Sequence, residues 1–285
     1  MRSSIDLHIA GSRLGGMRLG AVRPSDVQAW ATERAQQLAP LTTRNLLGLL
    51  RSVFASAVLD RLIASSPVVR VQLPGPSGPR VVPLTVEQVQ ALAAAMPDRH
   101  RGLVIVQAAL GLRLGELLAL RVEDVDFLRR VVHVRSQFAS GIRERVEPKT
   151  PRSKRDVPLP QVAADAIAAH LARYAAAEDG TIFTGANGLP HRGDWYGTRV
   201  FRRAVEAAGL PKGTTSHDLR HHYASVLLAA GESVVAVAER LGHDDAALVL
   251  KTYGHLMPDS EDRTRRAVDE AWCAPSVPRE GSSLR

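Results

Sequence analysis

Side chains that can bind an anion, carry a proton or act as a nucleophile gather in one stretch of the chain, residues 215–256. Among them are His217, Arg220, His243 and Tyr253. Their neighbours are otherwise apolar and typical of core helices. His217 and Arg220 are three residues apart, so a helix that begins near Ser216 places both on one face. The stretch therefore indicates a site made of imidazole, guanidinium and phenol groups near helix ends.

The residues between these groups predict three short helices. Thr215 and Ser216 are suited to cap the first one, and Asp218 falls in its first turn, where the helix dipole favours an anion. Gly231 and Gly242 each follow an apolar helical run, as glycine does at helix ends. Pro258 stops the last helix.

The composition limits what kind of protein can carry this site. Hydrophobic residues make up 45% of the 285 residues, which is typical of a globular chain of one or two domains. The sequence has neither a run of about eighteen apolar residues nor an apolar signal segment, so we expect no membrane contact and a cytoplasmic location. The single cysteine, Cys273, excludes an internal disulfide framework and a multi-cysteine metal site.

Positive charge is concentrated in the first quarter of the chain. Residues 1–80 hold ten arginines, no lysine and four acidic residues, a net charge of +6 out of +8 for the whole protein. Such a bias favours a polyanionic partner such as nucleic acid. The alternative is a solvated surface in an arginine-rich protein.

Two helices are predicted before a proline-rich segment. Residues 1–20 lack hydrophobic periodicity and are expected to be irregular. A first helix runs from Pro24 and is ended by Pro40, and a second, capped by Thr42 and Thr43, extends through Leu62. The stretch 65–83 holds five prolines and two glycines, and its last part, 75–83, is interpreted as a linker.

From residue 84 onwards the pattern changes to a longer, core-rich domain. Thr85 and Gln88 form a capping-box pattern for a helix ending at Met96. Further helices are predicted near residues 101–110, 114–120, 160–177, 195–208 and 261–272, and short strands at 131–135, 142–146 and 155–159. The prediction is a mainly α chain with a small antiparallel β-sheet (α+β), followed by a flexible tail.

Two further segments with basic residues precede the stretch 215–256. Arg113 follows a Gly-Leu turn at the start of an apolar helix, and Lys149 and Lys154 flank a proline-containing turn before a strand. With these positions, the segments GLRLGELLAL, PKTPRSKRDVPL, HDLRHHYAS, RLGH and KTYGH resemble the tyrosine recombinase (phage integrase) family, in its order and with plausible spacing. The resemblance covers most of residues 20–258.

The resemblance implies a domain organisation. Residues 1–74 would form a helical, SAM-like core-binding domain, residues 84–258 the catalytic domain, and residues 259–285 a carboxy-terminal helix and tail. Core-binding domains of this family have four to five helices, and the pattern here begins at a later one. The first helix or helices are therefore expected to be missing, so that the domain would be amino-terminally truncated.

The resemblance also implies a reaction. The Tyr253 hydroxyl would attack a DNA phosphate to give a 3′-phosphotyrosyl intermediate and a free 5′-hydroxyl. Arg113 and Arg220 would bind the non-bridging oxygens, since guanidinium pairs bidentately with phosphate. His217 would act as the base for Tyr253, His243 would donate to the phosphate, and Lys149 would be the acid for the leaving oxygen. Neither a metal, a cofactor nor ATP is required for this chemistry.

Each position also has a simpler interpretation. Arg113 could merely pair with Glu116, Lys154 competes with Lys149 for one role, and His243 could be a helix-terminal cation. His217 and His221 have the i, i+4 spacing of a metal-binding pair but lack the glutamate of an HExxH helix. His221 and His222 are interpreted as a structural pair, one of them near DNA. Tyr253 alone would be expected to be a core aromatic residue, and the role of His255 stays open.

The expected partner is double-stranded DNA with attachment-type sites, bound by a homo-oligomer, a tetramer on two duplexes, with a directionality factor as an accessory. Arg44, Arg51 and Lys154 are the predicted DNA contacts. The alternatives are a catalytically impaired DNA-binding relic and a type IB topoisomerase-like nicking and closing enzyme. Neither the target sequence nor the choice between integration, excision and resolution follows from these residues.

Overall fold

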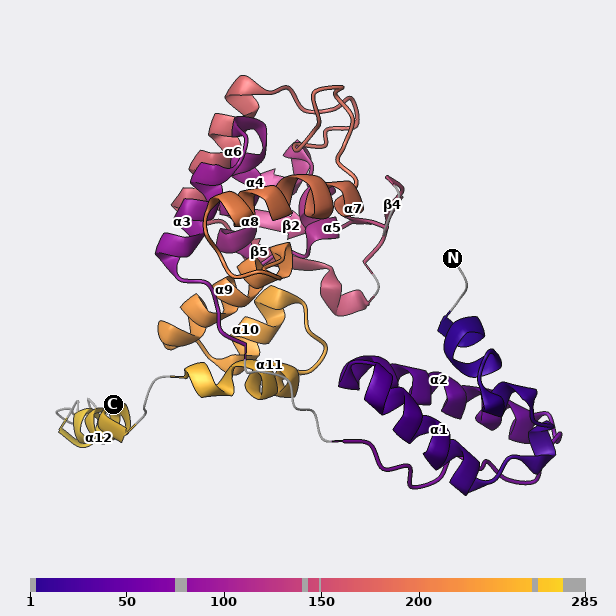
Figure 1. Ribbon diagram of the computed structural model, residues 1–285. Helices are drawn as coiled ribbons and strands as arrows, with labels where there is room; N and C mark the ends of the chain where they lie inside the picture. Colours follow the sequence, from indigo (N-terminus) through magenta and orange to yellow (C-terminus); the bar gives the residue numbers. More distant parts are fainter. Residues whose placement is uncertain (1–3, 75–80, 140–142, 149, 258–260, 274–285) are drawn as a thin grey trace, which may run out of the picture. The chain divides into compact units, whose positions relative to one another are not determined.

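The computed structural model of this protein describes residues 4–74, 81–139, 143–148, 150–257 and 261–273. The chain divides into two compact units, Met1–Arg80 and Val81–Arg285, which are drawn in indigo and in magenta to yellow in Figure 1. None of the described helices is both long enough and apolar enough to cross a membrane. Each unit is taken by itself below.

The first unit is built on two helices, α1 (Pro24–Gln37) and α2 (Pro40–Leu59). They share a core that includes Trp30, Leu50 and Phe54. Three short helical segments precede them, a π-helix at Asp6–Ala10 and 3-10 turns at Arg13–Gly16 and Leu19–Ala21. The expectation that residues 1–20 are irregular is therefore wrong. These segments bury only Ile9 and Leu14, too few apolar residues to produce a visible period.

Pro40 has a different role from the predicted one. It stands at the first position of α2, directly after the N-cap Ala39. A proline fits there because its fixed φ is helical and its missing N–H would have had no intrahelical acceptor. Thr43, expected to cap this helix, is instead buried within it.

The second unit is centred on helix α4 (Asp98–Leu110). Around it pack α3 (Val86–Ala95), α6 (Gln161–Arg173) and α9 (Ser216–Ala229). Thr85 and Gln88 exchange the two hydrogen bonds of the predicted capping box, at 2.9 and 3.2 Å. The large core of this unit continues through α5 (Leu114–Leu118) and α8 (Arg202–Ala207).

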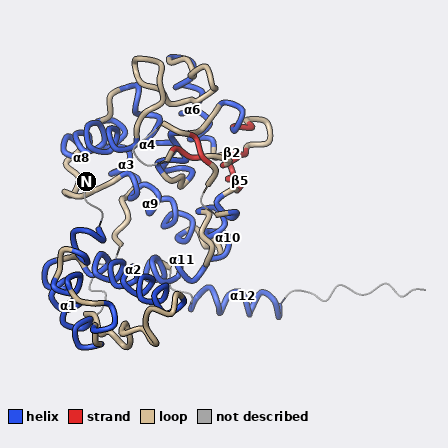
Figure 2. Tube along the Cα trace, turned by 90° about the vertical axis from the view of Figure 1, so that its right-hand side faces the viewer, coloured by secondary structure: helices blue, strands red, loops and turns tan. Residues whose placement is uncertain are grey.

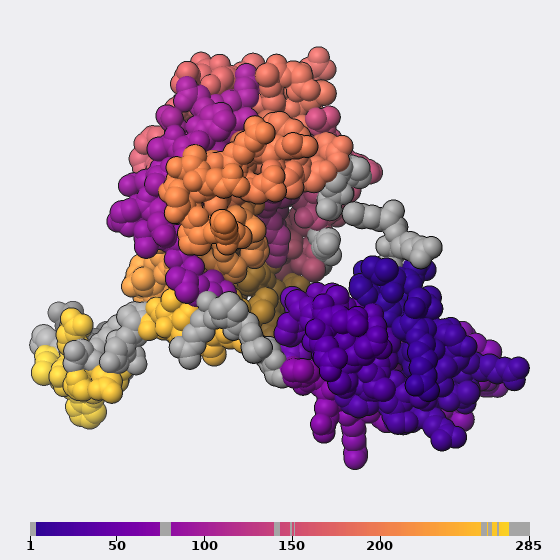
Figure 3. All heavy atoms as spheres, in the orientation of Figure 1, coloured from indigo at the N-terminus to yellow at the C-terminus, as the bar shows by residue number. Residues whose placement is uncertain are grey.

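The helix expected at 195–208 is divided into three segments. It consists of α7 (Gly193–Trp195), a π-helix at Tyr196–Phe201 and α8. In Figure 3 these segments, in orange, lie on the surface of the second unit, where α8 packs against α3. The π-helical segment buries Tyr196, Val200 and Phe201. The apolar spacing predicts a helix here but does not reveal the change from α to π geometry.

The strands form two small antiparallel sheets along one edge of this unit (Figure 2). The first has the order β1 (Val125–Asp126), β2 (Val131–Val134), β5 (Arg155–Pro158), with Val132 opposite Val125 and Val157. The second pairs β3 (Gln137–Phe138) with β4 (Arg145–Val146). The alternation of buried and exposed residues along β5 matches a sheet with one face on the core. The predicted fold class, mainly helical with a small antiparallel sheet, is confirmed.

The three helices predicted around the candidate groups are present. They are α9, α10 (Val234–Leu241) and α11 (Ala246–Tyr253), followed by a 3-10 turn at Gly254–Leu256. Gly231 and Gly242 follow the first two with φ of 88° and 64°, a left-handed conformation that glycine adopts without strain. A smaller apolar core holds these helices together. Helix α12 (Glu261–Cys273) follows in the sequence.

Candidate active site

Helix α9 begins at a double cap. The Asp218 carboxylate accepts hydrogen bonds from the backbone N–H and the hydroxyl of Thr215, at 2.7 and 2.9 Å. The cap fixes where the helix starts, and so which side chains its first two turns present. The rings of His217 and His221, one turn apart, meet edge to face with their centroids 4.7 Å apart.

Among the described residues, Arg220 is the largest fully buried side chain, with 1% of its surface exposed. Its Nη1 donates to the carbonyl of Gly111 at 2.6 Å and its Nη2 to the carbonyl of Leu241 at 2.5 Å. Burial, followed by the charge of Arg113, lowers the pKa of Arg220 to about 9. The guanidinium is therefore still a cation at neutral pH, and in the described part of the chain it is held by carbonyls and not by a carboxylate.

Arg113 and a second buried arginine share one carboxylate. Glu116 accepts from Nη1 of Arg113 at 2.8 Å, and from Nη1 and Nη2 of Arg155 at 3.1 and 2.9 Å. Burial opposes ionisation of Glu116, but the two arginines outweigh it and lower the pKa of the carboxyl. Arg113 and Arg155 thus share one carboxylate while Arg220 bonds to carbonyls, so among the described residues this cluster of three guanidinium groups carries an excess of positive charge.

His243 lies at the turn after α10. Gly242 precedes it, and the Nη2 of Arg113 donates to the carbonyl of that glycine at 3.0 Å. The Nδ1 of His243 is buried and has no hydrogen-bond partner among the described residues. Burial, together with Arg220 and Arg113, lowers the pKa of His243 to about 4. Within the part of the chain that the structure describes, this ring nitrogen of His243 is therefore unpaired.

Tyr253 is the last residue of α11 and only 2% exposed. Its hydroxyl lies 2.5 Å from the Nδ1 of His221. Burial raises the pKa of the phenol, while the charge of Arg220 opposes that rise. The phenol is therefore protonated at neutral pH and hydrogen-bonded to a residue of α9.

His217 stands beside this pair and is exposed at the surface. The protein around the His217 ring removes part of its solvation, which disfavours the charged form, and together with the charges of His221 and Arg220 this lowers the pKa of His217 to about 4. His222, by contrast, is buried, and its Nδ1 lies 2.7 Å from the carbonyl of Leu84. The structure thus separates the two adjacent histidines, with His222 against the carbonyl of Leu84 and His221 against the hydroxyl of Tyr253.

The remaining predicted positions are less tightly held. Lys149 lies outside the described residues. Lys154 pairs with Glu147 at 2.8 Å and keeps 42% of its side chain exposed. Within the first unit, Arg51 is exposed, whereas Arg44 is half-buried and its Nη2 lies 3.3 Å from the carbonyl of Pro74. The side chain of Arg44 is thus less free to reach a phosphate than that of Arg51.

Three residues make contacts in this site that the sequence does not fully predict. Motif spacing does not point to Arg155, indicates Glu116 only as a simple partner of Arg113, and leaves His221 as a structural residue. A signal for Glu116 exists, since it follows Arg113 at capping-box spacing and its carboxylate accepts from the backbone N–H of Arg113 at 2.9 Å. Arg155 and His221 act through partners 39 and 32 residues away, which local spacing does not reveal.

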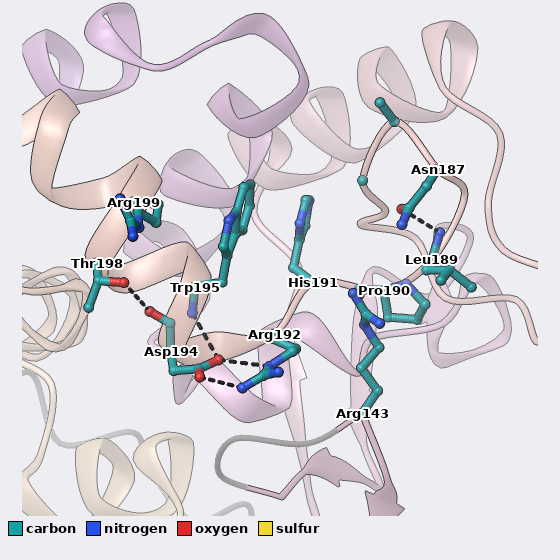
Figure 4. A pocket seen from close by; sticks show the side chains of 12 residues that line it. Arg143, Asn187, Leu189, Pro190, His191, Arg192, Asp194, Trp195, Thr198 and Arg199 are labelled. Carbon is teal, nitrogen blue, oxygen red and sulfur yellow. Dashed lines mark hydrogen bonds and ion pairs between the residues drawn. The ribbon is translucent and has the colours of Figure 1, made fainter.

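A pocket of about 800 Å³ lies elsewhere in the same unit (Figure 4). Trp195 lies parallel to His191 there, with ring centroids 5.7 Å apart. Arg192 pairs with Asp194 at 2.6 Å, while Arg199 has no hydrogen bond or ion pair to any described residue. The pocket is therefore basic and partly aromatic.

Comparison with known proteins identifies the family. Residues 83–259 match the phage integrase family. The prophage phiRv2 integrase of Mycobacterium tuberculosis is 30% identical over 263 residues, which cover 89% of this chain and 68% of that protein. The tyrosine recombinase XerC-like protein of Caldanaerobacter subterraneus is 25% identical, over 92% of this chain and 75% of that protein.

Solved structures agree with this result. The Tn1549 transposon integrase in complex with a circular intermediate DNA has a TM-score of 0.77 and 26% identity, covering 92% of this chain and 89% of that one. A lambda integrase dimer bound to a core site has a TM-score of 0.66 at 16% identity, covering 83% and 81%, and shows the likeness of fold alone. The chain therefore belongs to the phage integrase family and is a site-specific DNA recombinase of the tyrosine type.

Proposed function

We propose that Tyr253 is the nucleophile that attacks a DNA phosphate and forms a 3′-phosphotyrosyl intermediate. The observation that carries this proposal is the cationic cluster of Arg113, Arg155 and Arg220 around Glu116. A buried excess of positive charge costs stability in the free protein. A phosphodiester, and still more the doubly charged transition state of its cleavage, would neutralise it, so the cluster favours the transition state.

The roles within the site follow from their contacts. Arg113 and Arg220 keep N–H donors beyond those given to Glu116, Gly242, Gly111 and Leu241, because each guanidinium carries five. Those donors would bind the non-bridging oxygens. His243 would donate to the same phosphate, and its unpartnered Nδ1 supports a ligand there. His217, exposed beside them, would complete the phosphate contacts.

Lys149 is proposed as the acid that protonates the leaving 5′-oxygen. The other lysine in this region, Lys154, is paired with Glu147 and is better suited to contact the DNA backbone. The reaction keeps the energy of the cleaved bond in the phosphotyrosyl link, so resealing by the free 5′-hydroxyl needs neither ATP nor another cofactor.

The proposed DNA partner is a duplex with attachment-type sites. Residues 1–74 would act as the core-binding domain, joined by a linker at 75–83 to the catalytic domain, 84–258. Arg51, Arg44 and Lys154 would contact phosphates, and Arg199 in the pocket of Figure 4 offers a further cation. Two duplexes would be held by a homotetramer, with an accessory directionality factor. Complexes of relatives with DNA support the choice of partner.

Covalent capture tests this function. The full chain is mixed, in EDTA, with DNA fragments that carry a nick near the cleavage position. Cleavage then frees the short piece between the nick and the cut, which carries the 5′-hydroxyl, and once this piece diffuses away the strand cannot be resealed. The proposal predicts a DNA–protein species on a denaturing gel that protease removes. Tyr253→Phe should bind DNA as well as the wild type and form none. An adduct formed by Tyr253→Phe would refute the assignment of the nucleophile.

A further inference from the structure

The hydroxyl of Tyr253 is in contact with a histidine other than the one that the family resemblance implies as its base. The Nδ1 of His221 lies 2.5 Å from the hydroxyl oxygen, and the two rings are 5.5 Å apart at 61°. In the described part of the chain, no hydrogen bond joins His217 to Tyr253. The exposed His217 contacts the ring of His221 instead.

We infer that His221 is a catalytic residue, the base that accepts the proton of Tyr253 during strand cleavage. This inference rests on the proposed function of Tyr253 as the nucleophile. The tyrosine oxygen forms a bond to phosphorus as the bond from phosphorus to the 5′-oxygen breaks. The phenol proton passes to Nδ1 of His221, and the leaving 5′-oxygen takes a proton from a separate acid, the role proposed for Lys149. In the resealing step both transfers reverse, and His221 returns its proton to Tyr253.

The position of His221 on α9 suits this role. It follows Arg220 directly, so one turn of one helix holds both a phosphate-binding cation and the base. Arg220 is anchored to the carbonyls of Gly111 and Leu241, which limits how far that turn can shift. The base and the phosphate site are therefore fixed relative to each other before DNA binds, the kind of positioning that proton transfer needs.

The surroundings of His221 keep it able to accept a proton. The groups that face it are His217, Asp218 and Arg220 on its own helix and Tyr253 on α11. Burial lowers the pKa of His221, Asp218 opposes this shift and Arg220 adds to it. The ring is thus neutral at neutral pH, and with its proton on Nε2 its Nδ1 is free to accept. A negatively charged phosphate in the site would make the protonated ring easier to form.

The same contact could have a different purpose. If His221 only held Tyr253 in a resting position, breaking the hydrogen bond would release the nucleophile and speed cleavage. If His221 were only a packing residue, its loss would affect folding but not the dependence of cleavage on pH. The base, by contrast, must change the rate of the chemical step and its pH profile together.

The test is single-turnover cleavage of a nicked duplex by the full chain, from about pH 5 to about pH 9, on either side of the ordinary pKa of histidine. Two replacements are compared with the wild type. His221→Asn keeps an acceptor near Nδ1 without its basicity, and His221→Phe keeps the volume of the ring. Each should slow adduct formation by about 10²–10⁴-fold, the usual contribution of a general base, and remove the fall in rate at acid pH. DNA affinity should stay within about twofold, a small free-energy change.

Two controls separate the outcomes. His133→Asn removes a histidine whose pairing with Asp156 lies in the surface sheet, and should cleave like the wild type. A fluorinated tyrosine at position 253, whose phenol is more acidic, should recover part of the rate that His221→Asn loses, a rescue that a structural role does not predict. Wild-type or faster cleavage by His221→Asn, or loss of the acid limb in His217→Asn alone, would overturn the inference. An adduct that forms without Tyr253 would instead overturn the proposed function.

Discussion

Glu116 is the residue whose replacement tests the cationic cluster most strongly. Its side chain is 1% exposed and accepts four hydrogen bonds, one from the backbone N–H of Arg113, one from the Arg113 guanidinium and two from Arg155. Glu116→Gln keeps the shape but replaces one carboxylate oxygen by an NH₂ group. Because that group is a donor facing other donors, up to two of the four bonds disappear together with the charge.

The expected cost is set by the charge that remains. Arg155, with 6% of its side chain exposed, would lose its ion-pair partner inside the protein. Removing one member of a buried pair costs about 3–5 kcal/mol, because the other charge stays buried without compensation. The retained amide oxygen places Glu116→Gln near the lower end, at about 3 kcal/mol. This is a large fraction of a typical stability of about 5–15 kcal/mol.

The measurement is urea unfolding of the full chain followed by circular dichroism, with hydrogen exchange in α5 and β5 to assign the transition to the second unit. Glu123→Gln is the matched control, since Glu123 pairs with Arg121 at 2.7 Å but keeps 69% of its side chain exposed. The control should change stability by less than about 1 kcal/mol. An equally small effect of Glu116→Gln would refute the claim that this carboxylate holds two arginines in place.

Three further outcomes are expected. Arg51→Ala with Arg44→Ala should weaken DNA binding and reduce the slope of log affinity against log salt by about 0.9 for each phosphate that is no longer neutralised. The exposed Arg51 should contribute the larger share. Fluorescence anisotropy at several salt concentrations measures this slope, and an unchanged slope would exclude these two arginines as phosphate ligands. Lys149→Ala should cleave slowly and recover its rate on DNA whose leaving 5′-oxygen is replaced by sulfur, because a thiolate leaves without protonation by an acid. Lys154→Ala should alter DNA binding alone. Slow cleavage by Lys154→Ala that the sulfur substrate rescues would instead assign the acid to Lys154. Burial, with the charge of Arg99 adding to it, lowers the pKa of His100 and of His191 from 6.5 to about 4. The unfolded chain therefore binds more protons between these two pH values, and the free energy of unfolding should fall as the pH drops from 6.5 towards 4. Urea unfolding across this range should show a smaller loss of stability for His191→Phe than for the wild type, and an equal loss would exclude His191 as a cause of the pH dependence.

The elements around the site were predictable because their signals are local. The Thr215 cap, the apolar run that follows it and Gly242 define α9 and α10 within a few residues. The Thr85–Gln88 capping box does the same for α3. Such patterns depend on neighbours three or four residues apart, which the sequence displays directly.

Contacts between distant segments were not predictable in this way. Nothing in the spacing of HDLRHHYAS indicates that His221 faces Tyr253 while His222 faces Leu84. Both histidines follow Arg220, and only the packing of α11 and of residue 84 against α9 distinguishes them. Likewise, the link from Arg155 to Glu116 depends on how β5 and α5 are placed in the folded unit. The motifs thus indicate which residues form the site, but not all of their partners.

The central claim is that Tyr253 becomes covalently joined to DNA, and the attachment can be located directly. Lys251 lies two residues before Tyr253, so trypsin releases Tyr253 on a peptide that contains no other tyrosine. The adduct trapped on nicked DNA would be digested with nuclease and trypsin and analysed by mass spectrometry. The account predicts a nucleotide on the Tyr253 peptide, linked through a 3′-phosphate, and a free 5′-hydroxyl on the released strand. A nucleotide on any other peptide, or a 5′-linked adduct, would contradict it.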